Sequence, residues 1–96
     1  MAKFDVGETA VCSIEVRDMD GVLKNPATSM TITITNPSGT KVVDTQSMGT
    51  PDSTGKYHYD YTSAESAIAG EYNVLYVATD GSRIAKQTDK FQLEAV

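Results

Sequence analysis

The sequence predicts an all-β antiparallel sandwich of six or seven short strands with no disulfide. Three observations carry this prediction: apolar and polar residues alternate along most of the chain, turn residues interrupt the alternation at short intervals, and no segment has the length and periodicity of an ordinary helix. Short strands separated by turn signals are typical of two packed sheets. A small closed barrel is the alternative architecture.

The first half of the chain contains three expected strands, at residues 10–17, 30–35 and 40–46. Turn chemistry ends the first two, in the segments Asp-Met-Asp-Gly at 18–21 and Asn-Pro-Ser-Gly at 36–39. We expect residues 22–28 to form a loop with one short edge strand, and residues 47–54 to form the longest irregular stretch.

The second half begins with a strand in which Tyr57, Tyr59 and Tyr61 share one face. Residues 63–69 have the only helical tendency and predict one or two turns that cross between the sheets. Residues 72–79 are strongly β, and Asp80-Gly81 favours a type I′ turn into a hairpin with residues 82–87. Residues 88–90 predict a bulge or a break before a last strand at 91–94.

Size and charge limit the possible functions. Ninety-six residues predict a single domain over 1–96, and 40% apolar content is enough to build a core. The net charge is −5 and the eight lysines and arginines are scattered, so nucleic acid is not an expected partner. No apolar stretch approaches the roughly 20 residues that span a bilayer, and the first residues lack the apolar core of a signal peptide, so no membrane association is expected.

The sequence contains few residues in arrangements that support catalysis. His58, the sole histidine, is predicted on the polar face of its strand, whereas Cys12, the sole cysteine, has inward parity and is expected to be a buried thiol. The chain has no Gly-x-Ser-x-Gly motif and no phosphate-binding glycine loop. We therefore expect no enzyme activity, no catalytic residue and no cofactor.

The first turn contains a weak candidate for a metal-binding site, where Asp18 and Asp20 precede Gly21. Carboxylates in such turns hold Ca²⁺ in some β-domains, but Asp and Gly are more often plain turn formers. We therefore expect Asp18 and Asp20 to form a turn and to bind no metal.

A partner surface has better support. If Tyr72, Val74 and Tyr76 face the core, then Leu75 and Val77 face outward. Scattered surface apolar residues are common, but a contiguous patch there predicts docking against another protein subunit.

Two Gly–charged–Tyr sequences open strands. Gly70-Glu71-Tyr72 predicts a tyrosine corner, in which the phenol is buried and its hydroxyl bonds to backbone just upstream. The sequence at 55–57 more simply begins a strand whose tyrosines line the core.

The order of these motifs resembles an immunoglobulin-like module. The resemblance runs from Phe4 to Leu93 and rests on Gly-Glu-Thr at 7–9, the turns at 18–21 and 36–39, and the two Gly–charged–Tyr sequences. It departs from antibody domains in having no cystine and no tryptophan, and Val74 stands where the second cysteine would follow Tyr72.

Such modules occur in tailed-phage virions and in prokaryotic surface proteins. With its own Met1 and no export signal, the chain is similar to small virion accessory proteins, which implies a capsid decoration or head–tail component located in the virion. The partners implied are other virion subunits, with a homo-oligomer in a symmetric assembly among the expected arrangements. The alternative is an extracellular adhesion or stalk module of a bacterial or archaeal surface protein.

Overall fold

The computed structural model describes residues 2–95, which form seven strands. These are β1 (Ala2–Asp5), β2 (Thr9–Glu15), β3 (Ser29–Thr35), β4 (Lys41–Ser47), β5 (Lys56–Thr62), β6 (Gly70–Asp80) and β7 (Arg83–Glu94). They make a five-stranded sheet in the order β1-β7-β6-β3-β4 and a two-stranded sheet of β2 and β5. The predicted all-β sandwich without a disulfide is confirmed.

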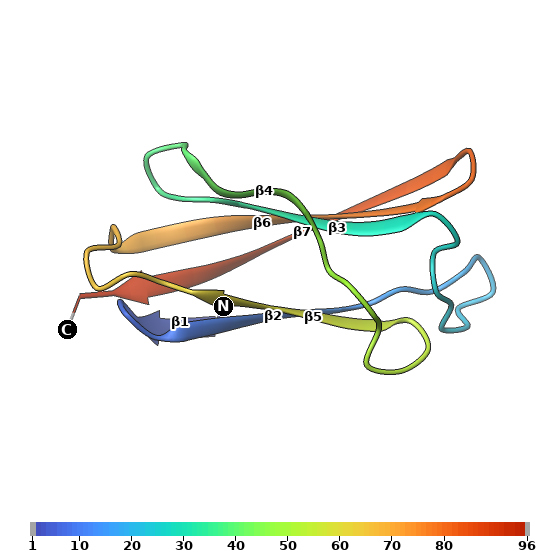
Figure 1. Ribbon diagram of the computed structural model, residues 1–96, viewed down its shortest axis with the longest axis horizontal. Helices are drawn as coiled ribbons and strands as arrows, with labels where there is room; N and C mark the ends of the chain where they lie inside the picture. Colours follow the sequence, from blue (N-terminus) through green and yellow to red (C-terminus); the bar gives the residue numbers. More distant parts are fainter. Residues whose placement is uncertain (1, 96) are drawn as a thin grey trace.

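The two sheets lie as opposing layers (Figure 1). The β2–β5 pair runs along the bottom of the view, β3, β4 and β6 lie above it, and β7 crosses obliquely from the lower left to the upper right. Every strand pair is antiparallel except β1 and β7, which are parallel. The molecule is elongated, with extents of 42 × 22 × 20 Å.

The core follows from the alternation along the strands. Met30, Ile32 and Ile34 on β3 are buried, and so are Tyr72, Val74 and Tyr76 on β6, because every second side chain of a strand points to the same face. The rings of Tyr72 and Phe91 stack with centroids 5.1 Å apart and an interplanar angle of 12°. Aromatic stacking at the end of β7 thus closes one end of the sandwich.

The β6–β7 hairpin is present, but its turn is not the predicted type I′. Asp80 pairs with Arg83, so Gly81 and Ser82 form the two-residue loop. Only Gly81 has a positive φ, of 62°. A type I′ turn needs positive φ at both loop positions, whereas a glycine at the first position alone is typical of type II′.

The expected break at residues 88–90 was wrong. β7 continues without interruption, and Leu75 pairs with Thr88, Val74 with Asp89 and Asn73 with Lys90. All residues from 83 to 90 are exposed although they pair with β6. β2 lies across from this part of the strand but leaves a cavity between Ile14 and Ala85, so the polar residues of β7 stay accessible.

Residues 63–69 cross from β5 in one sheet to β6 in the other, as expected, but the helical tendency was wrong: residues 65 and 66 form a turn and the rest is irregular. Ser63 explains the outcome, because its hydroxyl donates to the carbonyl of Glu8 (2.8 Å) and accepts from the amide of Gly7 (2.9 Å). A serine bonded to distant backbone competes with helix formation.

Within the described part of the chain there is no helix of the length and hydropathy that a bilayer-spanning segment requires. Residues 22–28 make only a bridge between Arg17 and Leu23, not an edge strand.

The outer strand β4 is irregular. Its pairing with β3 shifts register on both sides of Ile34, and Thr45 has a φ of 49°. The amide of Thr45 donates to the hydroxyl of Thr33 instead of a main-chain carbonyl. These are the marks of a β-bulge, which twists an edge strand and disrupts its ladder.

Candidate interaction surface

The outer face of the five-stranded sheet carries the two residues that the sequence singles out for partner binding. Leu75 and Val77 lie half-buried on β6, on the side opposite the core. On β3, Thr33 is paired with Leu75 and Thr31 with Val77. We call this surface the threonine face and define it by Thr31, Thr33, Thr35, Leu75, Val77 and Thr88.

The threonine face forms a shallow depression of about 530 Å³, which Lys41 and Lys90 also line. Both lysines are in ion pairs: Lys41 lies 3.9 Å from Asp44, and Lys90 lies 3.2 Å from Glu71. Lys86, which pairs with Val77 across β6 and β7, has no ion pair among residues 2–95. The face is therefore mildly apolar at its centre with free positive charge beside Val77.

Gly70 and Tyr72 have the geometry of a tyrosine corner. The hydroxyl of Tyr72 donates to the carbonyl oxygen of Ile68, four residues upstream, at 2.7 Å. Gly70 has a φ of 138°, and a Cβ there would lie 2.8 Å from the Cγ of Pro37. Gly70 and Tyr72 therefore fix the position of the first residues of β6, the strand that carries Leu75 and Val77.

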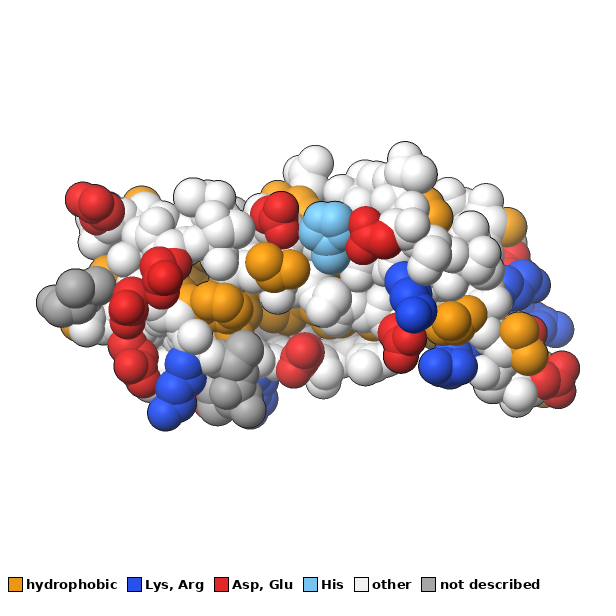
Figure 2. Space-filling model, turned by 90° about the horizontal axis from the view of Figure 1, so that it is seen from below, with side chains coloured by type: hydrophobic (Ala, Val, Ile, Leu, Met, Phe, Trp, Pro, Cys, Tyr) orange, Lys and Arg blue, Asp and Glu red, His pale blue; other side chains and the backbone are white. Residues whose placement is uncertain are grey.

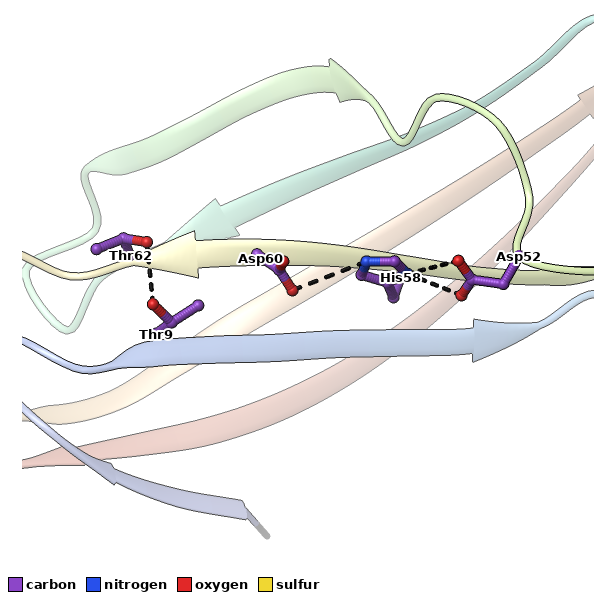
Figure 3. A network of polar contacts seen from close by, with 5 residues as sticks. All are labelled: Thr9, Asp52, His58, Asp60 and Thr62. Carbon is purple, nitrogen blue, oxygen red and sulfur yellow. Dashed lines mark hydrogen bonds and ion pairs between the residues drawn. The ribbon is translucent and has the colours of Figure 1, made fainter.

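The opposite surface is the outer face of β2 and β5, which we call the histidine face. Figure 3 shows His58 between Asp52 and Asp60 along β5. The Nδ1 atom of His58 lies 2.7 and 2.9 Å from the two carboxylate oxygens of Asp52, and Nε2 lies 3.9 Å from Asp60. The contact joins the loop before β5 to the strand itself, and sequence reasoning missed it.

Asp52 and Asp60 also shift the titration of the histidine. The hydrogen bond to Asp52, and next its charge, raise the pKa of His58 above its ordinary value. A neighbouring carboxylate favours the charged imidazolium. The sole cysteine is not beside this histidine, because Cys12 and His58 project to opposite sides of the β2–β5 sheet.

Cys12 is buried, as the sequence predicts, with 6% of its surface exposed. Burial, followed by the charges of Asp89 and Asp60, raises the pKa of its thiol to about 11. The thiolate, which is the nucleophilic and metal-binding form, is therefore scarce at neutral pH.

Asp18 acts as a turn former. Its Oδ1 accepts hydrogen bonds from the amides of Asp20 (2.9 Å) and Val22 (3.0 Å). A carboxylate that bonds amides two and four residues later is an Asx-type turn. No group of three or more His, Cys, Asp or Glu side chains in the described residues is placed to hold a metal ion.

A recess beside β2 was not foreseen from the sequence. Two contiguous cavities of about 210 and 110 Å³ share Val16, Arg17, Ala78 and Ala85 in their walls. Ala78 lies directly across from Ala85 in the β6–β7 ladder, and two methyl groups are too short to fill the space up to β2. We call this recess the hollow.

Comparisons with known proteins add no identification: no family model, no curated protein and no solved structure matches the chain.

Proposed function

We propose that this chain is a non-catalytic structural or binding module that docks on a protein subunit through the threonine face. The observation that carries the proposal is the position of Leu75 and Val77, which lie side by side on an open sheet face. A flat apolar centre with a polar surround is typical of a non-obligate protein interface.

The surrounding chemistry supports a protein partner. Threonines on neighbouring strands present methyl groups and hydroxyls together, and the free ammonium of Lys86 lies on the strand beside Val77. The chain carries −5 overall, so a local positive group favours a partner with an acidic patch over a polyanion.

The setting that we propose is the virion of a tailed phage, with the chain as a capsid decoration or head–tail component. The resemblance of the motifs to immunoglobulin-like virion modules supports it, and so does the modest size of the threonine face. A small interface binds weakly by itself, but it suffices where many copies occupy a repeating lattice.

The test is cosedimentation of the purified chain with capsids of the phage that encodes it. Saturation at a fixed number of copies per capsid is expected, and Leu75→Asp should lower the affinity roughly tenfold or more, because a charge would enter the centre of the interface. Val22→Asp is the matched control, since Val22 is exposed (60%) but lies in a loop away from the threonine face.

Absence of capsid binding by the wild-type chain would refute the virion setting. Equal binding by Leu75→Asp and the wild type would refute the threonine face as the docking surface.

A further inference from the structure

We propose that two copies of this chain associate antiparallel through the open edge of β2, which joins their two-stranded sheets into one continuous sheet of four. The threonine face lies on the other sheet and remains free in such a pair. The proposal is therefore independent of the docking function and rests on three observations.

The first observation is a row of backbone groups without a strand partner. β2 has only β5 as a neighbour among the described strands. The amide of Ser63 donates to the carbonyl of Glu8, and the amide of Val16 donates to the carbonyl of Gly55. Main-chain groups alternate in direction along a strand, so the even-numbered residues from 8 to 16 direct theirs toward β5. The odd-numbered residues point theirs to the open side: Thr9, Val11, Ser13 and Glu15.

The second observation is that the other edges are less suited to strand addition than the edge of β2, although β5 is covered by its own loop only at Lys56. β4 has a bulge at Thr45, and β1 has only four residues. On β5, the loop that precedes the strand already bonds both main-chain groups of Lys56, through Asp52 and Ser53. Bulges, short length and covering loops are the devices that protect sheet edges, and β2 over Thr9–Glu15 shows none of them.

Full overlap of two β2 strands places the two-fold axis at Cys12, the middle of Thr9–Glu15. Thr9 then lies opposite Glu15 of the second copy, and Val11 lies opposite Ser13. No like charges meet in this register, which avoids the penalty of paired carboxylates. Val11 is 53% exposed beside the edge, and the added strand would cover part of it.

The third observation is the uneven distribution of charge along the molecule. In the view of Figure 2, most of the side chains at the left end that carry charge are acidic, and most of the basic side chains lie at the right end, where acidic ones are interspersed. At the acidic end, Glu8 lies in the β1–β2 turn and Glu65 packs over Gly7. At the other end, Asp18 and Asp80 line the hollow together with Arg17, Lys24 and Arg83. Arg17 is paired with Glu15 and Lys24 with Asp80, whereas Arg83 has no ion pair among the described residues.

An antiparallel pair brings these ends together twice. With the axis at Cys12, Glu8 of each copy lies opposite Val16 of the other, at the margin of the hollow. The acidic turn thereby comes to the end of the second copy that carries the free guanidinium of Arg83. A parallel pair would instead put acidic end against acidic end, so charge complementarity selects the antiparallel second copy.

The first experiment compares two prolines on one rung of the β2–β5 ladder. Val11 and Asp60 are cross-strand partners, and their amides point to opposite outer edges of the sheet. We expect sedimentation equilibrium of the full chain to show a monomer–dimer equilibrium. Val11→Pro should raise the dissociation constant roughly tenfold or more, because proline removes an edge donor, while Asp60→Pro leaves it within about twofold.

The second experiment exchanges charges and remains informative if Val11→Pro impairs folding. Arg83→Glu should weaken dimerisation, added salt should weaken the wild-type dimer, and Arg83→Glu combined with Glu8→Lys should recover at least half of the loss. The double variant restores opposite charges at both ends of a two-fold pair.

Three results would overturn the proposal. The first is a wild-type chain that stays monomeric at millimolar concentration. The second is an equal loss of dimer affinity in Val11→Pro and Asp60→Pro. The third is loss of the dimer in Leu75→Asp. The last would assign self-association to the threonine face. Capsid binding by a monomeric wild-type chain would refute the pairing and leave the docking function standing.

Discussion

The hydroxyl of Tyr72 donates a hydrogen bond of 2.7 Å to the carbonyl oxygen of Ile68. The ring of Tyr72 is 1% exposed and stacks on Phe91, so the phenol reaches its acceptor from inside the core. Burial raises the pKa of this hydroxyl. One side chain therefore ties the connection between β5 and β6 to the packed end of the sandwich.

Tyr72→Phe should lower the free energy of unfolding by about 1 kcal/mol or more, because the carbonyl of Ile68 loses its buried donor. Urea denaturation of the two proteins measures the difference. Tyr61→Phe is the control: Tyr61 also contacts this aromatic cluster, but its hydroxyl has no hydrogen bond to any described residue. Equal destabilisation by both variants would show that the bond to Ile68 contributes nothing specific.

Gly55→Ala should destabilise strongly. A Cβ at Gly55 would lie 2.6 Å from the carbonyl oxygen of Val16 and 2.8 Å from the amide nitrogen of Lys24, and φ is 73°. Gly39→Ala has the same backbone strain, with a φ of 88°, but no atom within 4 Å of the new Cβ. We expect Gly39→Ala to cost about 1 kcal/mol and Gly55→Ala at least about 2 kcal/mol more, as read from chemical denaturation.

His58 should titrate above its ordinary pKa in NMR spectra of the folded chain, because of its hydrogen bond to Asp52. Asp52→Asn should lower that pKa, whereas Asp60→Asn should change it less, since Asp60 is 3.9 Å away. If Asp60→Asn has the larger effect, the contact with Asp52 is not the main cause.

The same contact sets the sign of a pH effect on stability. The folded pKa of His58 lies above its unfolded value of about 6.5. The contact with Asp52 therefore contributes fully to the free energy of unfolding below pH 6.5, and this contribution is lost as the pH rises through the folded pKa. Denaturation midpoints of the wild type should therefore fall slightly more than those of His58→Gln across this window. The exposed position of the pair keeps the effect small.

Cys12 should react slowly with a thiol reagent at pH 8, because it is buried and its pKa is raised to about 11. Denaturant should make the reaction fast. A Ser13→Cys variant in a Cys12→Ala background is the matched probe, since position 13 is exposed on the other side of the same strand. Rapid labelling of native Cys12 would show that the β2 layer opens readily.

Periodicity was sufficient to locate most strands, because alternation reports directly which side chains meet the core. The buried residues at 30, 32 and 34, the tyrosines of β6 and the outward side chains of Leu75 and Val77 all follow from it. The misses have one physical cause, which is tertiary context. β1 exists because residues 2–5 pair with the end of β7, and the polar residues 88–90 stay in a strand because β6 supplies their partners.

The site features that escaped prediction depend on loops. Asp52 reaches His58 only because the loop before β5 folds back on the strand, where the amide of Asp52 donates to the carbonyl of Lys56. The hollow depends on Ala78 and Ala85 facing each other, which requires knowledge of the hairpin register. A one-residue shift in the turn would have paired different side chains.

The bulge at Thr45 has a consequence for how many copies can join. β4 is the outermost strand of the larger sheet, and its positive φ and shifted register make it a poor template for another strand. With β4 unsuited and the edge of β5 covered at Lys56, β2 over Thr9–Glu15 is the longest regular open edge of the copy. Strand addition through β2 ends at two copies, because a two-fold pair uses that edge of both of them.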